Sequence, residues 1–76
     1  IAAMLVRRVK KPAVTLSARE TEVLGLVAAG LSNPAIAKRL FVSEATVKTH
    51  LIHVFEKLGV SDRTRAVTLA MELGLL

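Results

Sequence analysis

Apolar residues recur at helical spacing through most of this chain, and no stretch alternates with the two-residue period of a strand. Four segments carry an apolar stripe of this kind, and each is bounded by residues that commonly cap helices. They cover residues 18–29, 33–40, 44–58 and 63–73. The pattern therefore predicts an all-α fold of four helices.

The first predicted helix has a defined start and a defined end. Ser17 and Glu20 have the S-x-x-E spacing of a capping box, in which each side chain binds the backbone N–H of the other residue. Gly30 can adopt the left-handed conformation that ends a helix in a Schellman motif. The apolar stripe between these two ends consists of Val23, Leu24 and Val27.

A short connection, residues 41–43, separates the second predicted helix from the third. Ser32 can cap the second helix, and Pro34 falls in its first turn, where a missing N–H costs little. Ser43 can cap the third helix, and Gly59 is the expected residue at its C-terminal end. A three-residue turn between two helices is typical of helix-turn-helix motifs.

The third predicted helix has two faces of different character. Its core face comprises Val47, Leu51, Val54, Phe55 and Leu58. The rest of its surface comprises Ala45, Thr46, Lys48, Thr49, His50, Ile52, His53 and Glu56. This second face mixes cations, hydroxyls and one large apolar side chain, so an exposed Ile52 requires an explanation.

The last predicted helix carries two apolar stripes. Asp62 can cap its start and Gly74 can close its end. The stripe that we expect to face the core consists of Ala66, Leu69, Ala70 and Leu73. Val67 and Met71 form a second stripe about 100° away around the helix. Scattered apolar surface residues are common, but two stripes on one terminal helix favour a dimer interface at Val67 and Met71.

The charge of the chain narrows the class of partner. Its 76 residues suffice for one small domain, and 11 Lys and Arg against 6 Asp and Glu give a net charge of +5. Such an excess suits a polyanion, either a nucleic acid or an anionic membrane surface. In a membrane-surface helix the cations gather opposite a continuous apolar face, and the cations of this chain do not. We therefore expect no membrane partner.

The residues that catalysis or metal binding would need do not form a set in the sequence. The chain has no Cys, and His50 and His53 lack the i, i+4 spacing of two ligands on one helix. We found no nucleophile with a base and an orienting group, and no Gly-rich phosphate loop. We expect no enzyme activity, no metal and no cofactor.

A domain boundary is predicted near residue 14. Residues 1–14 resemble the tail of a linker helix that Lys10, Lys11 and Pro12 interrupt, and residues 15–76 form the predicted domain. Because the chain begins at Ile1, we expect it to be part of a longer protein with an N-terminal regulatory domain. We found no apolar run of about 20 residues and no signal peptide, so the expected location is the cytoplasm.

The second and third predicted helices have the properties of a DNA-binding unit. In a helix-turn-helix, the first helix supports the second, whose N-terminal half enters a major groove about 12 Å wide. Small Ala37 lets the two helices cross closely. Lys48 and Thr49 lie one turn into the reading helix, where side chains reach base edges, and Ile52 can touch a thymine methyl.

Residues 15–76 resemble the LuxR/NarL-type (FixJ-like) DNA-binding output domain of bacterial transcription regulators. The matching segments are 16–20, 22–24, 30–33, 36–37, 42–43, 46–50 and 57–60, together with Arg63. The resemblance implies a four-helix helix-turn-helix domain that binds double-stranded DNA and regulates transcription as the output domain of a two-component response regulator. It also implies a homodimer on a palindromic or pseudo-palindromic operator, with RNA polymerase as a further candidate partner.

The resemblance assigns roles to individual residues. It places Lys48, Thr49 and Ile52 at base-reading positions. The positions where the family commonly contacts phosphates are Asn33, Ser43, Thr46 and Lys57. Two positions depart from the usual pattern: Pro34 removes a backbone N–H that could meet a phosphate, and Ile52 replaces a residue that is often polar or basic. Ile52 therefore favours apolar contact over hydrogen-bonded readout.

A second interpretation within DNA binding remains open. A sigma-factor-like domain would also carry a helix-turn-helix, but it would read a promoter as a monomer through RNA polymerase. The number of chains bound to each DNA site distinguishes it from a dimeric regulator.

Overall fold

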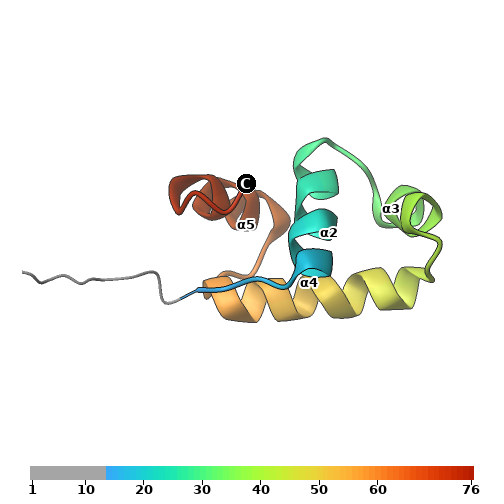
Figure 1. Ribbon diagram of the computed structural model, residues 1–76, viewed down its shortest axis with the longest axis horizontal. Coiled ribbons are helices and arrows are strands. Elements are labelled where there is room, and N and C mark those ends of the chain that lie inside the picture. The colour runs from blue at the N-terminus through green and yellow to red at the C-terminus, as the bar shows by residue number, and fades with distance from the viewer. Residues whose placement is uncertain (1–13) are drawn as a thin grey trace, which may run out of the picture.

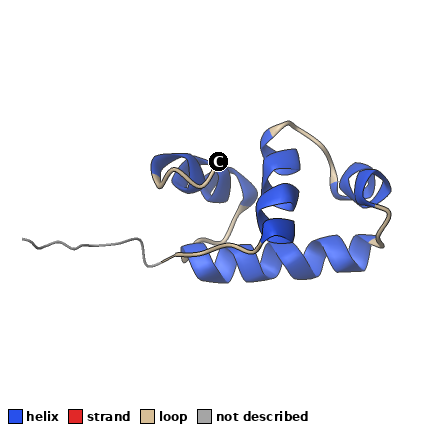
Figure 2. Ribbon diagram, in the orientation of Figure 1, coloured by secondary structure: helices blue, strands red, loops and turns tan. Residues whose placement is uncertain are grey.

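The computed structural model describes residues 14–76, which form four helices with no strand among them (Figures 1 and 2). The helices are α2 (Ala18–Ala28), α3 (Asn33–Leu40), α4 (Glu44–Leu58) and α5 (Arg63–Glu72). The all-α prediction is confirmed, and the predicted ends of the first and last helices lie one residue too far along the chain. The predicted linker over residues 1–14 lies outside the described residues except for Val14.

Each helix begins at the predicted cap. The side chains of Ser17, Ser32, Ser43 and Asp62 each accept a hydrogen bond from the backbone N–H three residues later. At Ser17 the full capping box is present, because the Ser17 N–H also donates to Glu20 Oε1 over 2.9 Å. A cap of this kind contributes about 1 kcal/mol of stability.

The helices also end in a common way, with one exception in residue type. A left-handed residue follows α2, α3, α4 and α5, and three of these residues are the predicted Gly30, Gly59 and Gly74. After α3 the residue is Phe41, with φ 59° and ψ 43°. This conformation costs a residue with a Cβ about 1 kcal/mol or more, and the sequence pattern did not reveal it.

The core is divided along α4. α2 stands across the middle of α4, α3 lies by its N-terminal end and α5 by its C-terminal end (Figure 1). One buried cluster joins α2, α3 and the first half of α4, and it contains Val23, Ile36, Ala37, Val47 and Leu51. The other joins α2, α5 and the second half of α4, and it contains Leu24, Val54, Leu58, Ala66 and Ala70. The two clusters hold α4 from one side only.

The predicted packing of the last helix is wrong in part. Leu73 was expected in the core but is 45% exposed, because α5 ends at Glu72 and the chain turns away there. Leu75 packs against the second cluster, after the turn at Gly74 brings its N–H to within 2.8 Å of the Ala70 carbonyl. Val67, expected to face outward, is half-buried and also packs against this cluster.

Candidate nucleic-acid interface

The outer face of α4 is the surface that the two core clusters leave uncovered. Lys48 and Thr49 are exposed on it, and Ile52 is 55% exposed although it is a large apolar residue. These three predicted base-reading residues lie within four positions of one another, so they occupy adjacent places on one side of the helix. The structure therefore brings them together on one accessible surface.

The hydroxyl of Thr49 is already engaged within its own helix. Its Oγ1 donates to the backbone carbonyl of Ala45 over 3.0 Å, a bond that Thr commonly forms with the residue four positions earlier. Ala45 is itself exposed on the same face.

The N-terminus of α4 presents two hydroxyl groups. Ser43 Oγ accepts from the Thr46 N–H over 3.1 Å, and it lies 3.0 Å from Thr46 Oγ1. A helix N-terminus favours anions, because its backbone N–H groups point outward and the helix dipole is positive there. Both predicted phosphate-contacting residues at this end therefore lie side by side at a site of favourable potential.

Asn33 is tied to the start of α5. Arg63 Nη1 donates to Asn33 Oδ1 over 2.6 Å, and Arg63 Nη2 donates to the Leu31 carbonyl over 3.1 Å. Arg63 thus joins the starts of α3 and α5. The sequence did not predict this role of Arg63, because no local signal connects residues that are 30 positions apart.

An open depression adjoins the exposed face of α4 beside the hydrogen-bonded Asn33 and Arg63. Its volume is about 310 Å³, and its lining residues are Asn33, Lys48, Leu51, Ile52, Phe55 and Arg63. Apolar side chains of α4 form its wall. The cations Lys48 and Arg63 and the amide of Asn33 complete the lining. The depression thus extends the predicted base-reading surface toward Asn33.

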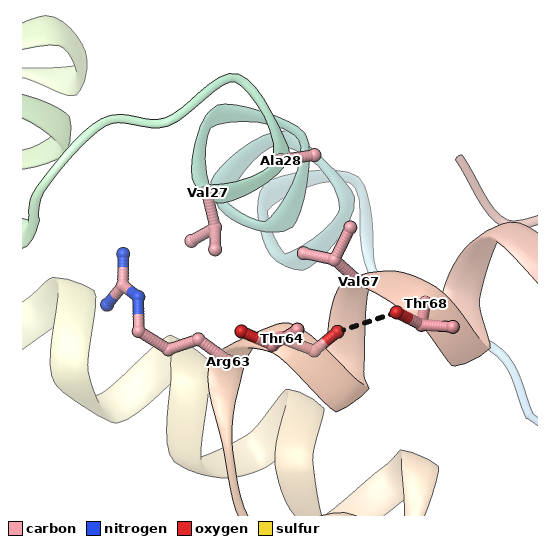
Figure 3. A pocket seen from close by; sticks show the side chains of 6 residues that line it. All are labelled: Val27, Ala28, Arg63, Thr64, Val67 and Thr68. Carbon is pink, nitrogen blue, oxygen red and sulfur yellow. Dashed lines mark hydrogen bonds between the residues drawn. The ribbon is translucent and has the colours of Figure 1, made fainter.

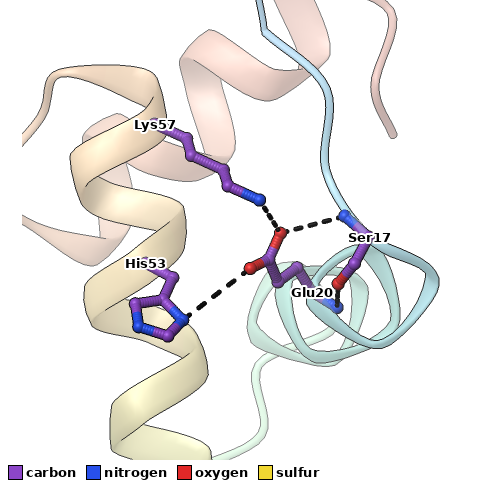
Figure 4. Close-up of polar contacts among 4 residues, drawn as sticks. All are labelled: Ser17, Glu20, His53 and Lys57. Atoms are coloured by element: carbon purple, nitrogen blue, oxygen red, sulfur yellow. Dashed lines mark hydrogen bonds and ion pairs between the residues drawn. The ribbon is translucent and has the colours of Figure 1, made fainter.

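Lys57 binds a buried carboxylate (Figure 4). Its Nζ lies 2.7 Å from Oε1 of Glu20, whose side chain is only 7% exposed, and His53 Nδ1 lies 3.9 Å from Oε2. The hydrogen bond from Lys57 holds the pKa of the Glu20 carboxyl below its ordinary value, and the Ser17 N–H adds to this, although burial acts in the opposite direction. The ammonium predicted to contact a phosphate is therefore also a structural link between α4 and α2.

The two residues predicted at a dimer interface have different surroundings. Figure 3 shows Val67 on α5 beside the end of α2, where it lines a pocket of about 300 Å³ with Val27 and Ala28. The polar lining residues of this pocket are Arg63, Thr64 and Thr68. Met71, by contrast, is 58% exposed. Met71 therefore offers more free surface to a partner than Val67 does.

Two further observations concern residues 14–76 only. No group of three His, Asp or Glu side chains is placed to hold a metal ion there. The helices of this region are too short or too polar to cross a membrane.

The chain is similar in sequence to known bacterial regulatory proteins. The profile of the bacterial regulatory proteins of the luxR family matches residues 14–70. Over 70 residues the chain is 54% identical to the probable transcriptional regulatory protein NarL of Mycobacterium tuberculosis. The aligned region covers 92% of this chain and 32% of NarL.

Two solved structures have the same fold. The response regulator ChrA of a heme-sensing two-component system superposes with a TM-score of 0.80 and 55% identity, over 91% of this chain and 34% of that one. The transcription factor GerE superposes with a TM-score of 0.77 and 38% identity, over 80% of this chain and 91% of that one. The chain spans about a third of the length of NarL and of ChrA. It belongs to the luxR family of bacterial regulatory proteins and is a helix-turn-helix, DNA-binding domain of a transcription regulator.

Proposed function

We propose that this domain reads a specific duplex sequence with α4 in the major groove, as the C-terminal output domain of a two-component response regulator. The observation that carries the proposal is the exposed N-terminal half of α4. Lys48, Thr49 and Ile52 share that face, while α3 packs behind it as a support. This is the arrangement by which helix-turn-helix proteins present base-contacting side chains.

Base edges differ in what they offer to such a face. Guanine presents two acceptors, O6 and N7, that suit the Lys48 ammonium, and thymine presents a methyl group that suits Ile52. Recognition of this kind needs hydrogen bonds and apolar contacts only. We therefore assign the domain a binding function without catalysis or a cofactor.

Phosphate contacts would fix the register of α4 in the groove. Ser43 and Thr46 stand at the N-terminus of α4, and Asn33 stands at the start of α3. An ammonium has three donors, so Lys57 can bind Glu20 and a phosphate together. These four residues lie toward the ends of the two helices, where the DNA strands pass in a helix-turn-helix complex.

The assembly that we propose is a homodimer on a palindromic or pseudo-palindromic operator. A two-fold contact uses the same patch on both chains, and α5 carries the exposed Met71 with Val67 one turn earlier. NarL and ChrA, both longer than this chain, support an N-terminal regulatory domain outside it. The regulator would act in the cytoplasm, where bacterial DNA lies, with RNA polymerase as a further partner.

The experiment that tests this function is selection of bound sequences from a random duplex library by the 76-residue chain. Fluorescence anisotropy then gives the affinity for the selected duplex and for its single-base variants. Lys48→Ala should weaken binding to the selected duplex by about 1–3 kcal/mol and relax discrimination at one base pair. The matched control is Arg65→Ala, which also removes one positive charge but lies on α5.

Three outcomes are informative. A loss confined to one base pair supports base reading by Lys48. An equal loss on all sequences makes Lys48 a phosphate contact instead. Enrichment of no sequence at all would contradict the proposed function.

A further inference from the structure

Three apolar groups follow one another along the exposed face of α4. Ala45, Thr49 and Ile52 are separated by four and three residues, so they lie in one row on the helix surface. All three are exposed, and no core residue covers them. Glu56 comes next in this row and carries a negative charge, which would repel a DNA strand. The apolar row is therefore confined to the N-terminal three turns of α4.

Thr49 belongs to this row through its methyl group. The hydroxyl hydrogen of Thr49 is donated to the Ala45 carbonyl, 3.0 Å away, so it is not free for a base. The Thr49 oxygen can still accept a hydrogen bond, but it has no hydrogen left for the O4 acceptor of thymine, so its methyl group is the contact that Thr49 offers to that base. Thr49 thus presents thymine with an apolar contact and with no hydrogen-bond donor.

The surroundings of the row indicate what covers it. Ile52 forms part of the apolar wall of the depression of about 310 Å³, beside the cationic Lys48 and Arg63. A nucleotide strand has this mixed chemistry, because apolar sugar and methyl groups lie close to charged phosphates. Among the four bases, thymine alone presents a methyl group in the major groove.

From these observations we propose that α4 selects thymine by its C5-methyl group, through a row made of Ala45, the Thr49 methyl and Ile52. The inference rests on the proposed DNA-binding function and names the base feature that the same surface reads. Lys48 stands beside the row and supplies the hydrogen-bond donor that the row itself does not offer.

The first test uses deoxyuridine, which pairs as thymine does but lacks the methyl group. The probe is the duplex that the chain selects from a random library, with each thymine replaced in turn. We expect affinity to fall about threefold to fivefold at each contacted thymine, as burial of one methyl group implies. An unchanged affinity at every position would overturn the inference while leaving the proposed function intact. If the library yields no selected duplex, the proposed function fails, and the inference fails with it.

The second test separates the two branches of Thr49. Thr49→Val keeps the methyl group and removes the hydroxyl, whereas Thr49→Ser keeps the hydroxyl and removes the methyl group. We expect Thr49→Val to retain affinity and the preference for thymine over deoxyuridine, and Thr49→Ser to lose both. The reverse order would show that the hydroxyl reads the base and would overturn the inference.

Ile52→Ala provides an independent measurement on the same row. It should lower the affinity for the selected duplex and abolish the deoxyuridine effect at one thymine position, while the effect at the other positions persists. Because Ile52 is exposed, circular dichroism should show an unchanged fold. Retention of the full deoxyuridine effect in this variant would contradict a row that includes Ile52.

Discussion

At the scale of single residues, Glu20 combines the most interactions. It completes the cap of α2 through Ser17, and it accepts a hydrogen bond from Lys57 on α4. A buried carboxylate is unfavourable without such partners. Here two donors, the Ser17 N–H and the Lys57 ammonium, compensate for its burial, so one side chain joins the start of α2 to α4.

Glu20→Gln should lower the free energy of unfolding by about 1–3 kcal/mol at neutral pH, because the charge-assisted bond to Lys57 is lost. The pKa of Glu20 is lowered in the folded state, so the stabilisation is complete above its ordinary value of 4.5. This stabilisation is lost as the pH falls through the lower pKa that Glu20 has in the folded protein. Urea unfolding of both proteins between pH 7 and pH 3 measures the difference, which should shrink on acidification.

The control for this prediction is Glu22→Gln on the same helix. Glu22 is exposed and pairs with Arg19 over 3.4 Å, so its loss should change stability by less than about 0.5 kcal/mol. A difference between wild type and Glu20→Gln that stays constant from pH 7 to pH 3 would show that Glu20 acts by shape rather than by charge.

Phe41 offers a prediction of opposite sign. Its backbone is left-handed and the residue is 94% exposed, so the ring contributes little to the core. Phe41→Gly should therefore raise stability by up to about 1 kcal/mol. Phe41→Ala removes the ring but keeps a Cβ, so it should bring no such gain. Thermal unfolding of the three proteins compares them, and equal stability of the Gly and Ala variants would contradict backbone strain at this turn.

At the scale of helices, the sequence predicted the features that depend on residues close together in the chain, such as helix starts and exposed faces. Caps such as Ser17 and Ser43 act within three residues, so their spacing alone identified the helix starts. The exposed positions of Lys48 and Ile52 followed in the same way from the apolar arc of α4. Their contact with DNA stays a prediction.

The contacts that the sequence did not predict depend on how helices cross. Arg63 meets Asn33 across 30 positions, and Glu20 meets Lys57 across 37. Val67 was placed outward because a helical wheel gives the angle between stripes but not the neighbours of each stripe. In the fold, the end of α2 stands beside Val67 and covers part of it.

The close crossing of α3 and α4 can be tested at Ala37, which is buried in the first cluster. Ala37→Leu would force extra volume between the two helices and should cost about 1–3 kcal/mol of stability. Ala18→Leu adds the same atoms at an exposed position and should have little effect. Urea unfolding measures both, and equal values would mean that the crossing has room for a larger residue.

At the scale of the whole molecule, the positive charge is unevenly distributed along the chain. Residues 14–76 hold seven Lys and Arg against six Asp and Glu, a net charge of +1. The rest of the excess comes from Arg7, Arg8, Lys10 and Lys11. The domain itself is therefore nearly neutral, and we expect its DNA affinity to depend more on the positions of its cations than on their number.

This distribution predicts two components of salt dependence. The logarithm of affinity should fall with the logarithm of salt by about 0.9 for each phosphate neutralised. Replacing the four N-terminal cations with Ser should reduce that slope by up to about 0.9 per residue and leave the preference for the selected duplex unchanged. Anisotropy titrations over a range of KCl concentrations measure the slope. A flat titration for the unaltered chain would contradict binding through phosphate contacts.

The last prediction concerns dimerisation. It is tested at Met71 because Val67 is half-buried. A charge at Val67 would disturb the packing against α2, so it could not separate a lost dimer from a damaged fold. Met71 is free of this difficulty because it is 58% exposed. In a two-fold dimer, Met71→Glu would place two carboxylates near the axis, where repulsion and lost solvation oppose the contact.

We expect Met71→Glu to fold normally, to bind a half-site as the unaltered chain does, and to lose cooperative binding to the full site. Met71→Leu keeps the apolar surface and should retain that cooperativity. Footprinting on half and full sites made from the selected duplex measures both variants. Undiminished cooperativity in Met71→Glu would place the dimer contact outside this patch. A patch of one exposed methionine and part of a valine is small, so pairing should become measurable only when DNA holds two chains on adjacent half-sites.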